Sequence, residues 1–138
     1  LLLVSEDILN KFNLEPIAKL RSMAVVGTDP VLMLSGPIPA TRKALDQAKL
    51  KPEDINLAEI NEAFSSVVGA WRKEFPEINY ENVNANGGSI AIGHPLGATG
   101  ARLMTNLIHE MKRNKLKYGL QAICEGGGTA NATIVELV

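Results

Sequence analysis

Three polar residues in this sequence have the types and spacing for chemistry on a carbonyl group. Asn61 follows the apolar segment LAEI, His94 lies inside the glycine-rich stretch 84–100, and Cys124 is followed by Glu125 and three consecutive glycines. Glycine clusters are entropically costly and usually mark positive φ or close backbone approach. A histidine and a thiol can move a proton while nearby backbone N–H groups hold a developing oxyanion. The pattern therefore predicts a site for acyl-thioester or carbonyl chemistry.

Each of these residues also has a simpler structural interpretation. Asn61 would serve as the N-cap of a helix beginning at Glu62, and His94 would be a loop histidine bonded to the backbone. Cys124 alone would be a small buried apolar side chain. His109 lies in the middle of a predicted helix with no neighbouring glycine, and we interpret it as a surface histidine. The combination of amide, imidazole and thiol, rather than any one of them, favours catalysis.

The composition of the 138-residue chain excludes several classes of protein. The 14 Lys and Arg residues against 15 Asp and Glu give a net charge of −1, which leaves no basic surface for nucleic acid or an anionic membrane. The single cysteine excludes an internal disulfide framework and fits a reducing compartment. No apolar run approaches the roughly 18 residues of a membrane span. The chain starts at Leu1 rather than Met, and we expect it to be a piece of a longer protein.

The hydrophobic periodicity predicts alternating strands and helices. Strands are expected at residues 1–4, 17–26, 57–60, 83–85, 118–124 and 129–138, and helices at 5–13, 38–49, 62–75 and 97–114. This order predicts an α/β fold with a mostly parallel mixed sheet, helices packed on it and an antiparallel C-terminal hairpin. Functional groups of such sheets gather at the carboxyl ends of the strands, where Asn61, His94 and Cys124 are expected.

Three segments closely resemble the signatures of the thiolase family, the acetyl-CoA C-acyltransferases. They are NEAF at residues 61–64, NGGSIAIGHPLGATGAR at 86–102 and CEGGGTANATIVEL at 124–137, and GPIPATRKAL at 36–45 also resembles the matching family segment. The motifs occur in family order and cover essentially the whole chain. The resemblance implies that residues 1–14 are the end of the N-terminal thiolase domain and residues 15–138 are the C-terminal domain.

The resemblance also implies a role for four residues in Claisen chemistry on coenzyme A thioesters. Cys124 matches the acid/base that moves the proton on the α-carbon. His94 matches the histidine that activates the nucleophilic cysteine and donates to a thioester oxygen, and Asn61 matches the residue that holds a water at the same oxyanion site. The backbone N–H of Gly126 matches one donor of a second oxyanion hole. The nucleophilic cysteine itself is expected in the N-terminal domain, so this chain alone is expected to be inactive.

Further expectations concern substrates, partners and location. Phe64 and Met33 match positions that pack against the pantetheine arm, although a core interpretation serves equally well, and Ala63 is expected beside the substrate. No covalently bound cofactor and no metal is expected, and coenzyme A thioesters are expected as substrates. The expected partners are the N-terminal thiolase domain and further copies in a homodimer or homotetramer. The chain ends without a peroxisomal tripeptide, so we expect the cytoplasm, or an organelle if an N-terminal signal lies outside this sequence.

Other functions remain as alternatives. A ketoacyl synthase would resemble a Cys-His-His site, whereas here a cysteine is closely followed by three glycines. A phosphate-binding loop at residues 93–100 would need a G-x-G-x-x-G or GK[ST] pattern, which is absent. A non-catalytic thiolase-like scaffold is a third alternative. Two positions depart from the family pattern, since Glu125 stands where an aliphatic or smaller residue is common and Ala130 stands where a further glycine is common.

Overall fold

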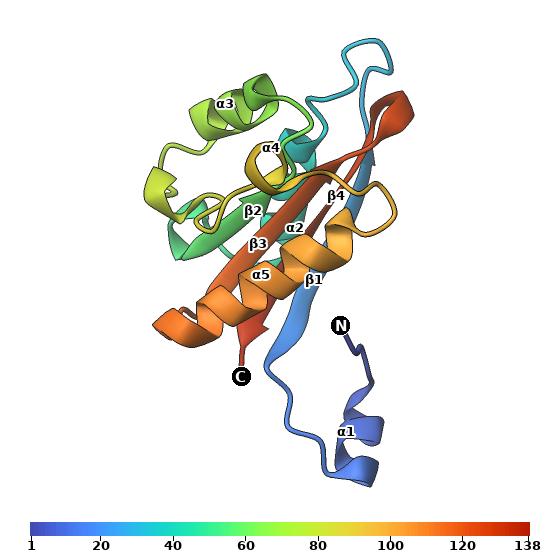
Figure 1. The fold of residues 1–138 in the computed structure, drawn as a ribbon, viewed down its shortest axis with the longest axis vertical. Helices are drawn as coiled ribbons and strands as arrows, with labels where there is room; N and C mark the ends of the chain where they lie inside the picture. Colours follow the sequence, from blue (N-terminus) through green and yellow to red (C-terminus); the bar gives the residue numbers. More distant parts are fainter.

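A four-stranded sheet with helices on both faces forms the body of the molecule (Figure 1). The computed structural model describes all residues, Leu1–Val138. The strands are β1 (Ala18–Gly27), β2 (Leu57–Ile60), β3 (Tyr118–Cys124) and β4 (Thr129–Leu137), in the spatial order β1-β4-β3-β2. The predicted α/β class, mixed sheet and antiparallel C-terminal hairpin are confirmed.

The expectation of a mostly parallel sheet needs a correction. Only β2 and β3 pair in parallel, whereas β4 pairs antiparallel with both β3 and β1. The physical reason is the insertion of β4 between β1 and β3. Strands β1, β2 and β3 all run in the same direction, but the reversed strand in the middle makes two of the three pairings antiparallel.

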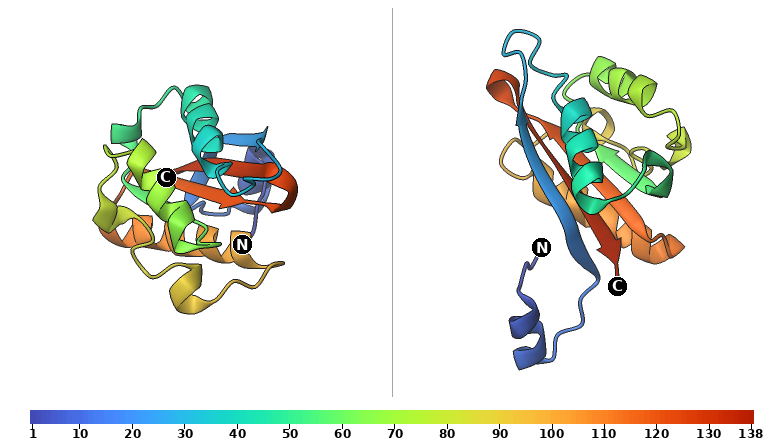
Figure 2. Two further views of the ribbon diagram at one scale, coloured as in Figure 1. Left: turned by 90° about the horizontal axis from the view of Figure 1, so that it is seen from above. Right: turned by 180° about the vertical axis from the view of Figure 1, so that it is seen from behind.

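Helices cover the two faces of the sheet unequally (Figure 2). The helices are α1 (Glu6–Phe12), α2 (Pro37–Ala48), α3 (Ser65–Glu74), α4 (Ser89–Ile92) and α5 (Thr99–Asn114), and short 3-10 turns occur at Pro52–Asp54, Tyr80–Asn82 and Gly126–Gly128. On one face α2 packs on β1, β3 and β4 and also contacts α3. On the other face α5 packs mainly on β2 and β3. The sheet is therefore sandwiched between helices at its centre.

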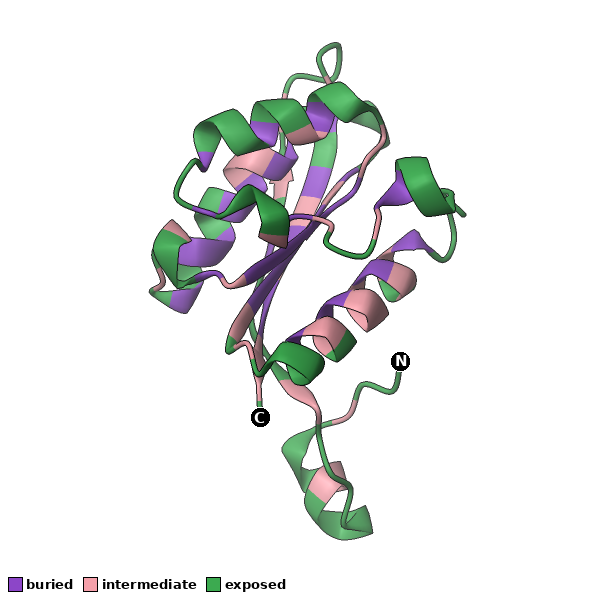
Figure 3. Ribbon diagram, turned by 60° about the vertical axis from the view of Figure 1, so that its left-hand side comes forward, coloured by how far each residue is buried: buried purple, intermediate pink, exposed green.

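The larger part of the core lies between the sheet and helices α2 and α3, as the burial colours show (Figure 3). Small side chains on α2 allow it to approach the sheet closely, and a Cβ atom on Gly36 would lie 2.6 Å from the Cβ of Ala130. Trp71 of α3 is fully buried, and its indole N–H donates to the Thr41 hydroxyl at 2.9 Å. The packed layer on this face includes Ile60 and Ala122, close to the ends of β2 and β3.

The interface between α5 and the sheet has an apolar half and a half that also buries polar side chains. Leu107 and Met111, in the C-terminal half of α5, form a small cluster with Leu57 and Val135. Gly119 is required there, because an added Cβ would lie 2.4 Å from the Met111 sulfur. Towards the N-terminal end of α5 several polar side chains are buried beside the apolar Leu103: Glu59, Thr99, Gln121 and part of Arg102. This half leads towards the carboxyl ends of β2 and β3.

Several predicted elements differ from those observed. Residues 1–4 form no strand, because they project from the body with α1 and have no neighbouring strand to pair with (Figure 1). The expected strand at 83–85 is reduced to one bridge between Val83 and Ala58. The helix expected at 62–75 begins only at Ser65, and α4 was not expected at all. None of the helices combines the length and the apolar character of a membrane span.

Candidate active site

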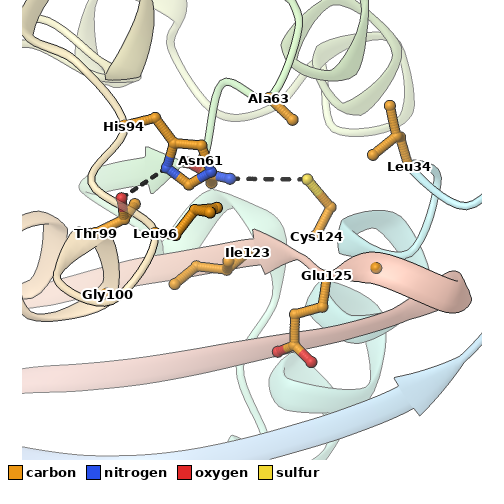
Figure 4. Close-up of a pocket in the computed structure, with 11 residues that line it drawn as sticks. Leu34, Asn61, Ala63, His94, Leu96, Thr99, Gly100, Ile123, Cys124 and Glu125 are labelled. Carbon is orange, nitrogen blue, oxygen red and sulfur yellow. Dashed lines mark hydrogen bonds between the residues drawn. The ribbon is translucent and has the colours of Figure 1, made fainter.

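A pocket of about 470 Å³ lies at the carboxyl ends of β2 and β3 and brings the three chemical groups together (Figure 4). Asn61 directly follows β2, Cys124 is the last residue of β3, and His94 comes from the loop between α4 and α5. Ala63 and Gly126 also line the pocket. The sequence prediction that these distant segments converge is therefore confirmed as geometry.

Cys124 is buried at one wall of the pocket, with 8 % of its surface exposed. The Asn61 side-chain amide donates towards its sulfur, with Nδ2 and Sγ 3.8 Å apart, and the backbone N–H of Ala63 also points at the sulfur. Burial raises the pKa of the thiol, and the Glu125 carboxylate raises it further, while these donors lower it. Burial has the larger effect, so the thiol is held protonated and is suited to deliver a proton.

His94 is presented at the pocket on a strongly bent loop. Gly93, directly before it, has a φ of 90°, which favours glycine. The His94 Nδ1 lies 2.6 Å from the Thr99 hydroxyl, and that hydroxyl donates its only hydrogen to the Pro95 carbonyl at 3.0 Å. Nδ1 must therefore carry the proton and donate to Thr99. This tautomer leaves Nε2 as a free acceptor, as a general base requires.

Asn61 is almost fully buried, and its side chain is held from both ends. The alternative of a helix N-cap is wrong, because α3 begins only at Ser65. Its Oδ1 accepts a hydrogen bond from the Ser89 hydroxyl at 3.0 Å, while Nδ2 faces Cys124. The amide is thus fixed with its donor end towards the pocket.

The glycine turn after Cys124 is shaped by two positive φ values. Gly127 and Gly128 have φ angles of 73° and 84°, and a Cβ on Gly128 would lie 2.6 Å from the Thr28 carbonyl oxygen. Glu125 lines the pocket, but its carboxylate accepts hydrogen bonds from Thr129 and Asn131 on β4. The Glu125 side chain points away from the Cys124 sulfur (Figure 4). Glu125, which departs from the family pattern, therefore stabilises the glycine turn through these hydrogen bonds.

The remaining expected contacts lie at the edge of the site. Phe64 is 62 % exposed and does not line the pocket, so its core interpretation is wrong. Met33 is half-buried with a φ of 55° in the loop before α2, and its neighbour Leu34 lines the pocket instead. Neither Phe64 nor Met33 lines the pocket that contains Cys124.

Comparison with known proteins identifies the family. A protein-family model described as the thiolase C-terminal domain matches residues 14–137. The chain belongs to the thiolase family. It is 53 % identical over 135 residues to a steroid 3-ketoacyl-CoA thiolase of Mycobacterium tuberculosis, covering 98 % of the chain and 33 % of that protein. It is 46 % identical over 138 residues to an acetyl-CoA acetyltransferase of Shinella zoogloeoides, covering 98 % and 34 %.

Solved thiolase structures share the fold. The acetyl-CoA acetyltransferase of Bacillus anthracis matches with a TM-score of 0.92 and 42 % identity, covering 97 % of this chain and 34 % of that one. A human mitochondrial 3-ketoacyl-CoA thiolase in complex with CoA matches with a TM-score of 0.93 and 39 % identity, covering 96 % and 34 %. The chain thus spans about a third of the length of these relatives.

Sequence reasoning missed four side chains of this thiolase domain. Thr99 fixes the His94 tautomer, Ser89 holds Asn61, Arg102 bonds to both Ser89 and the backbone before His94, and Glu59 is buried under α5. Glu59 and Arg102 carried a readable signal, because charged residues within apolar periodic segments are seldom buried without a partner. Ser89 and Thr99 had no signal beyond their place in the glycine-rich stretch.

Glu59 is the most perturbed carboxyl group in the domain. Its side chain is fully buried, and neither carboxylate oxygen has a hydrogen-bond partner within the chain. Burial raises its pKa from the ordinary value of 4.5 to about 7, while the Arg102 guanidinium lowers it and the carboxylates of Glu62 and Glu110 raise it. Glu59 is therefore neutral over much of the acidic range.

Glu59→Gln is expected to flatten the pH dependence of stability. Because the folded pKa lies above the unfolded one, the stabilising contribution of Glu59 is fully present below about pH 4.5 and is lost as the pH rises through about 7. At 1.36 kcal/mol per pKa unit, the free energy of unfolding of the wild type should fall relative to the variant by on the order of 3 kcal/mol between pH 4.5 and 8. Urea unfolding of both proteins across this range measures the difference. If the difference in the free energy of unfolding between the two proteins did not change with pH, the raised pKa of Glu59 would be contradicted.

Proposed function

We propose that this domain is the C-terminal part of an enzyme that cleaves 3-ketoacyl-CoA with coenzyme A, or condenses acetyl-CoA units in reverse, through an acyl-cysteine intermediate. The observation that carries the proposal is the convergence of Asn61, His94 and Cys124 on one pocket. The names of the relatives, 3-ketoacyl-CoA thiolase and acetyl-CoA acetyltransferase, support the same substrate class.

The groups in the pocket divide the chemistry between two proton carriers. The free Nε2 of His94 takes the proton of a nucleophilic thiol, which attacks the 3-keto carbonyl of the substrate. The resulting imidazolium donates to a thioester oxygen, with Asn61 supporting the same oxyanion. Breaking the carbon–carbon bond leaves the enolate of acetyl-CoA, and the Cys124 thiol delivers its proton to the α-carbon. The imidazolium proton then passes to the Cys124 thiolate. His94 takes the proton of the coenzyme A thiol as its sulfur attacks the acyl group, and gives that proton to the departing sulfur of the nucleophile, which restores both thiols.

The nucleophile is not in this chain, since Cys124 is its only cysteine. We place it in an N-terminal thiolase domain that packs on the α5 side of the molecule, and we assign residues 1–14 to the end of that domain. Several large apolar side chains on or near this side are exposed and would be covered by such a domain: Met23, Val25, Ile90, Ile92 and Leu96. The Gly126 backbone N–H would pair with a donor from the nucleophile's own loop to form the second oxyanion hole.

We also propose contacts to the substrate beyond the reacting atoms. Ala63 lines the pocket beside Cys124, and Phe64 and Met33 lie further out, where they would pack against the pantetheine arm of coenzyme A. The exposed ring of Phe64 suits such a contact, because it would lose its water-accessible surface only when the arm binds. A homodimer or homotetramer and a cytoplasmic location are proposed from the sequence alone.

The proposal is tested by joining this domain to its N-terminal thiolase domain and measuring CoA-dependent cleavage of a 3-ketoacyl-CoA series. Cleavage of at least one chain length is expected from the joined protein and none from the 138-residue chain alone, because the chain lacks the nucleophile. Cleavage by the chain alone would contradict the assignment of a nucleophile elsewhere. No turnover by the joined protein would instead favour a non-catalytic scaffold, and condensation that requires malonyl thioesters would favour a ketoacyl synthase.

A further inference from the structure

A line of hydrogen bonds runs from Arg102 on α5 to the Cys124 thiol. The Arg102 Nη2 donates to the Ser89 hydroxyl at 3.3 Å, and that hydroxyl donates to the Asn61 Oδ1 at 3.0 Å. The Asn61 Nδ2 then faces the Cys124 sulfur at 3.8 Å. Ser89, Asn61 and Cys124 are exposed by only 6 %, 1 % and 8 %, so water competes little for these bonds.

The direction of this line is set by its first member. A guanidinium has only donors and is always protonated, so Ser89 must accept from Arg102. The Ser89 hydrogen is then free for the Asn61 carbonyl oxygen, which leaves the Asn61 NH₂ group facing Cys124. Without Ser89, the amide could turn and present its carbonyl oxygen to the sulfur. A donor stabilises a thiolate and a carbonyl oxygen disfavours it, so the orientation of this amide affects the acidity of the thiol.

Arg102 also holds the backbone that leads to His94. Its Nη1 donates to the carbonyl oxygens of Ile92 at 3.1 Å and Gly93 at 2.5 Å. Gly93 immediately precedes His94, and an added Cβ there would meet nothing within 4 Å, so packing around Gly93 does little to hold the bend. The Arg102 side chain therefore holds the backbone before His94 directly and the Asn61 amide through Ser89.

We propose that Arg102 and Ser89 are positioning residues, which fix the donor end of the Asn61 amide on Cys124 and, through Arg102, the backbone before His94. Neither residue lines the pocket, so both act through the groups that do. The effect on turnover rests on the proposed function, whereas the effect on the thiol does not. The other titratable groups lining the pocket are His94 from its loop and Glu125 from the turn after β3, and both are unchanged in the variants below.

The first test uses the 138-residue chain, in which the rate of alkylation by iodoacetamide reports on Cys124 alone. For Ser89→Ala we expect the pH midpoint of alkylation to rise by about half a unit or more, so that alkylation below the midpoint slows about threefold, as expected for losing a weak hydrogen bond to a charged group. Ser89→Thr keeps the hydroxyl and should restore the midpoint. Ser22→Ala is the matched control, because Ser22 is also buried but donates to Ala44 on the opposite face. Equal midpoints for Ser89→Ala and the wild type would overturn the proposal.

The second test uses the joined enzyme. Ser89→Ala and Arg102→Lys should lower kcat about tenfold or more and change KM less than about threefold, because they disturb the reacting groups and not the substrate contacts. Lysine keeps the charge of Arg102 but lacks the planar guanidinium, which donates both to Ser89 and to the backbone before His94. Wild-type kcat in both variants, with an inactive Cys124→Ala enzyme beside them, would overturn the positioning role and leave the proposed function standing. If no version of the enzyme turns over, the proposed function fails, and the alkylation midpoints still decide the positioning role.

Discussion

Cys124→Ala is expected to lower thiolytic turnover of the joined enzyme by about 10³-fold or more. General acid–base catalysis typically contributes about 10²–10⁴-fold, and no other group in the pocket can replace this thiol. The carboxylate of Glu125 is bonded to β4 and points away. His94 serves the nucleophile in the proposed reaction. Steady-state cleavage of a 3-ketoacyl-CoA, measured over a range of pH, gives the loss.

The same variant should keep the half-reaction that does not move an α-proton. Exchange of an acyl group between the nucleophile and coenzyme A needs His94 but not Cys124, so labelled coenzyme A should still exchange into acetyl-CoA at a rate within about tenfold of the wild type. Cys124→Ser provides a matched control for shape, because a hydroxyl fills the same space but is a far weaker acid than a thiol. Turnover of Cys124→Ala within tenfold of the wild type would refute the acid role.

In the proposed reaction, the state of the Cys124 thiol affects cleavage and condensation differently. Burial raises its pKa, so the protonated form that thiolysis needs dominates near neutral pH. Condensation starts from the thiolate, which must remove an α-proton. The surroundings of Cys124 therefore favour the proton-donating form of the thiol, and the donors from Asn61 and Ala63 only partly offset this preference.

The sequence was sufficient to predict the three side chains that converge on the pocket, because each has a local signal. Asn61 and Cys124 come at the ends of apolar strands, and His94 lies between a glycine and a proline. The boundaries of β2 and β3 were predicted for the same reason, since turn residues follow each of them. A candidate site residue at a strand end can thus be recognised before its partners are known.

Features that depend on long-range pairing were not predictable in this way. Residues 1–4 have the composition of a buried strand, but a strand forms only where a neighbour supplies hydrogen bonds, and here none is present. The insertion of β4 between β1 and β3 is equally invisible in a local pattern. The link from Arg102 through Ser89 to Asn61 joins residues up to 41 positions apart, and only the folded structure brings them together.

His94→Ala is expected to be the most damaging single change, with a loss of about 10⁴-fold in kcat. In the proposed reaction the side chain has two tasks, because it first accepts a proton at Nε2 and then donates to a thioester oxygen. Proton transfer accounts for about 10²–10⁴-fold, and loss of one oxyanion donor typically costs about 2.7–4 kcal/mol. Acyl exchange should fail together with thiolysis, which distinguishes this variant from Cys124→Ala.

Two matched variants separate the chemistry of His94 from general effects of the substitution. His109→Ala removes an exposed histidine of α5 far along the helix from the pocket and should keep wild-type turnover. Thr99→Val keeps the shape beside His94 but removes the oxygen that accepts from Nδ1, so the imidazole loses its fixed tautomer and orientation. For Thr99→Val we expect kcat to fall about 10- to 100-fold, which lies between the effects of His109→Ala and His94→Ala. Equal turnover of His94→Ala and His109→Ala would exclude the His94 imidazole from the reaction. The structure would then hold a free Nε2 acceptor in the pocket that no step of the reaction uses.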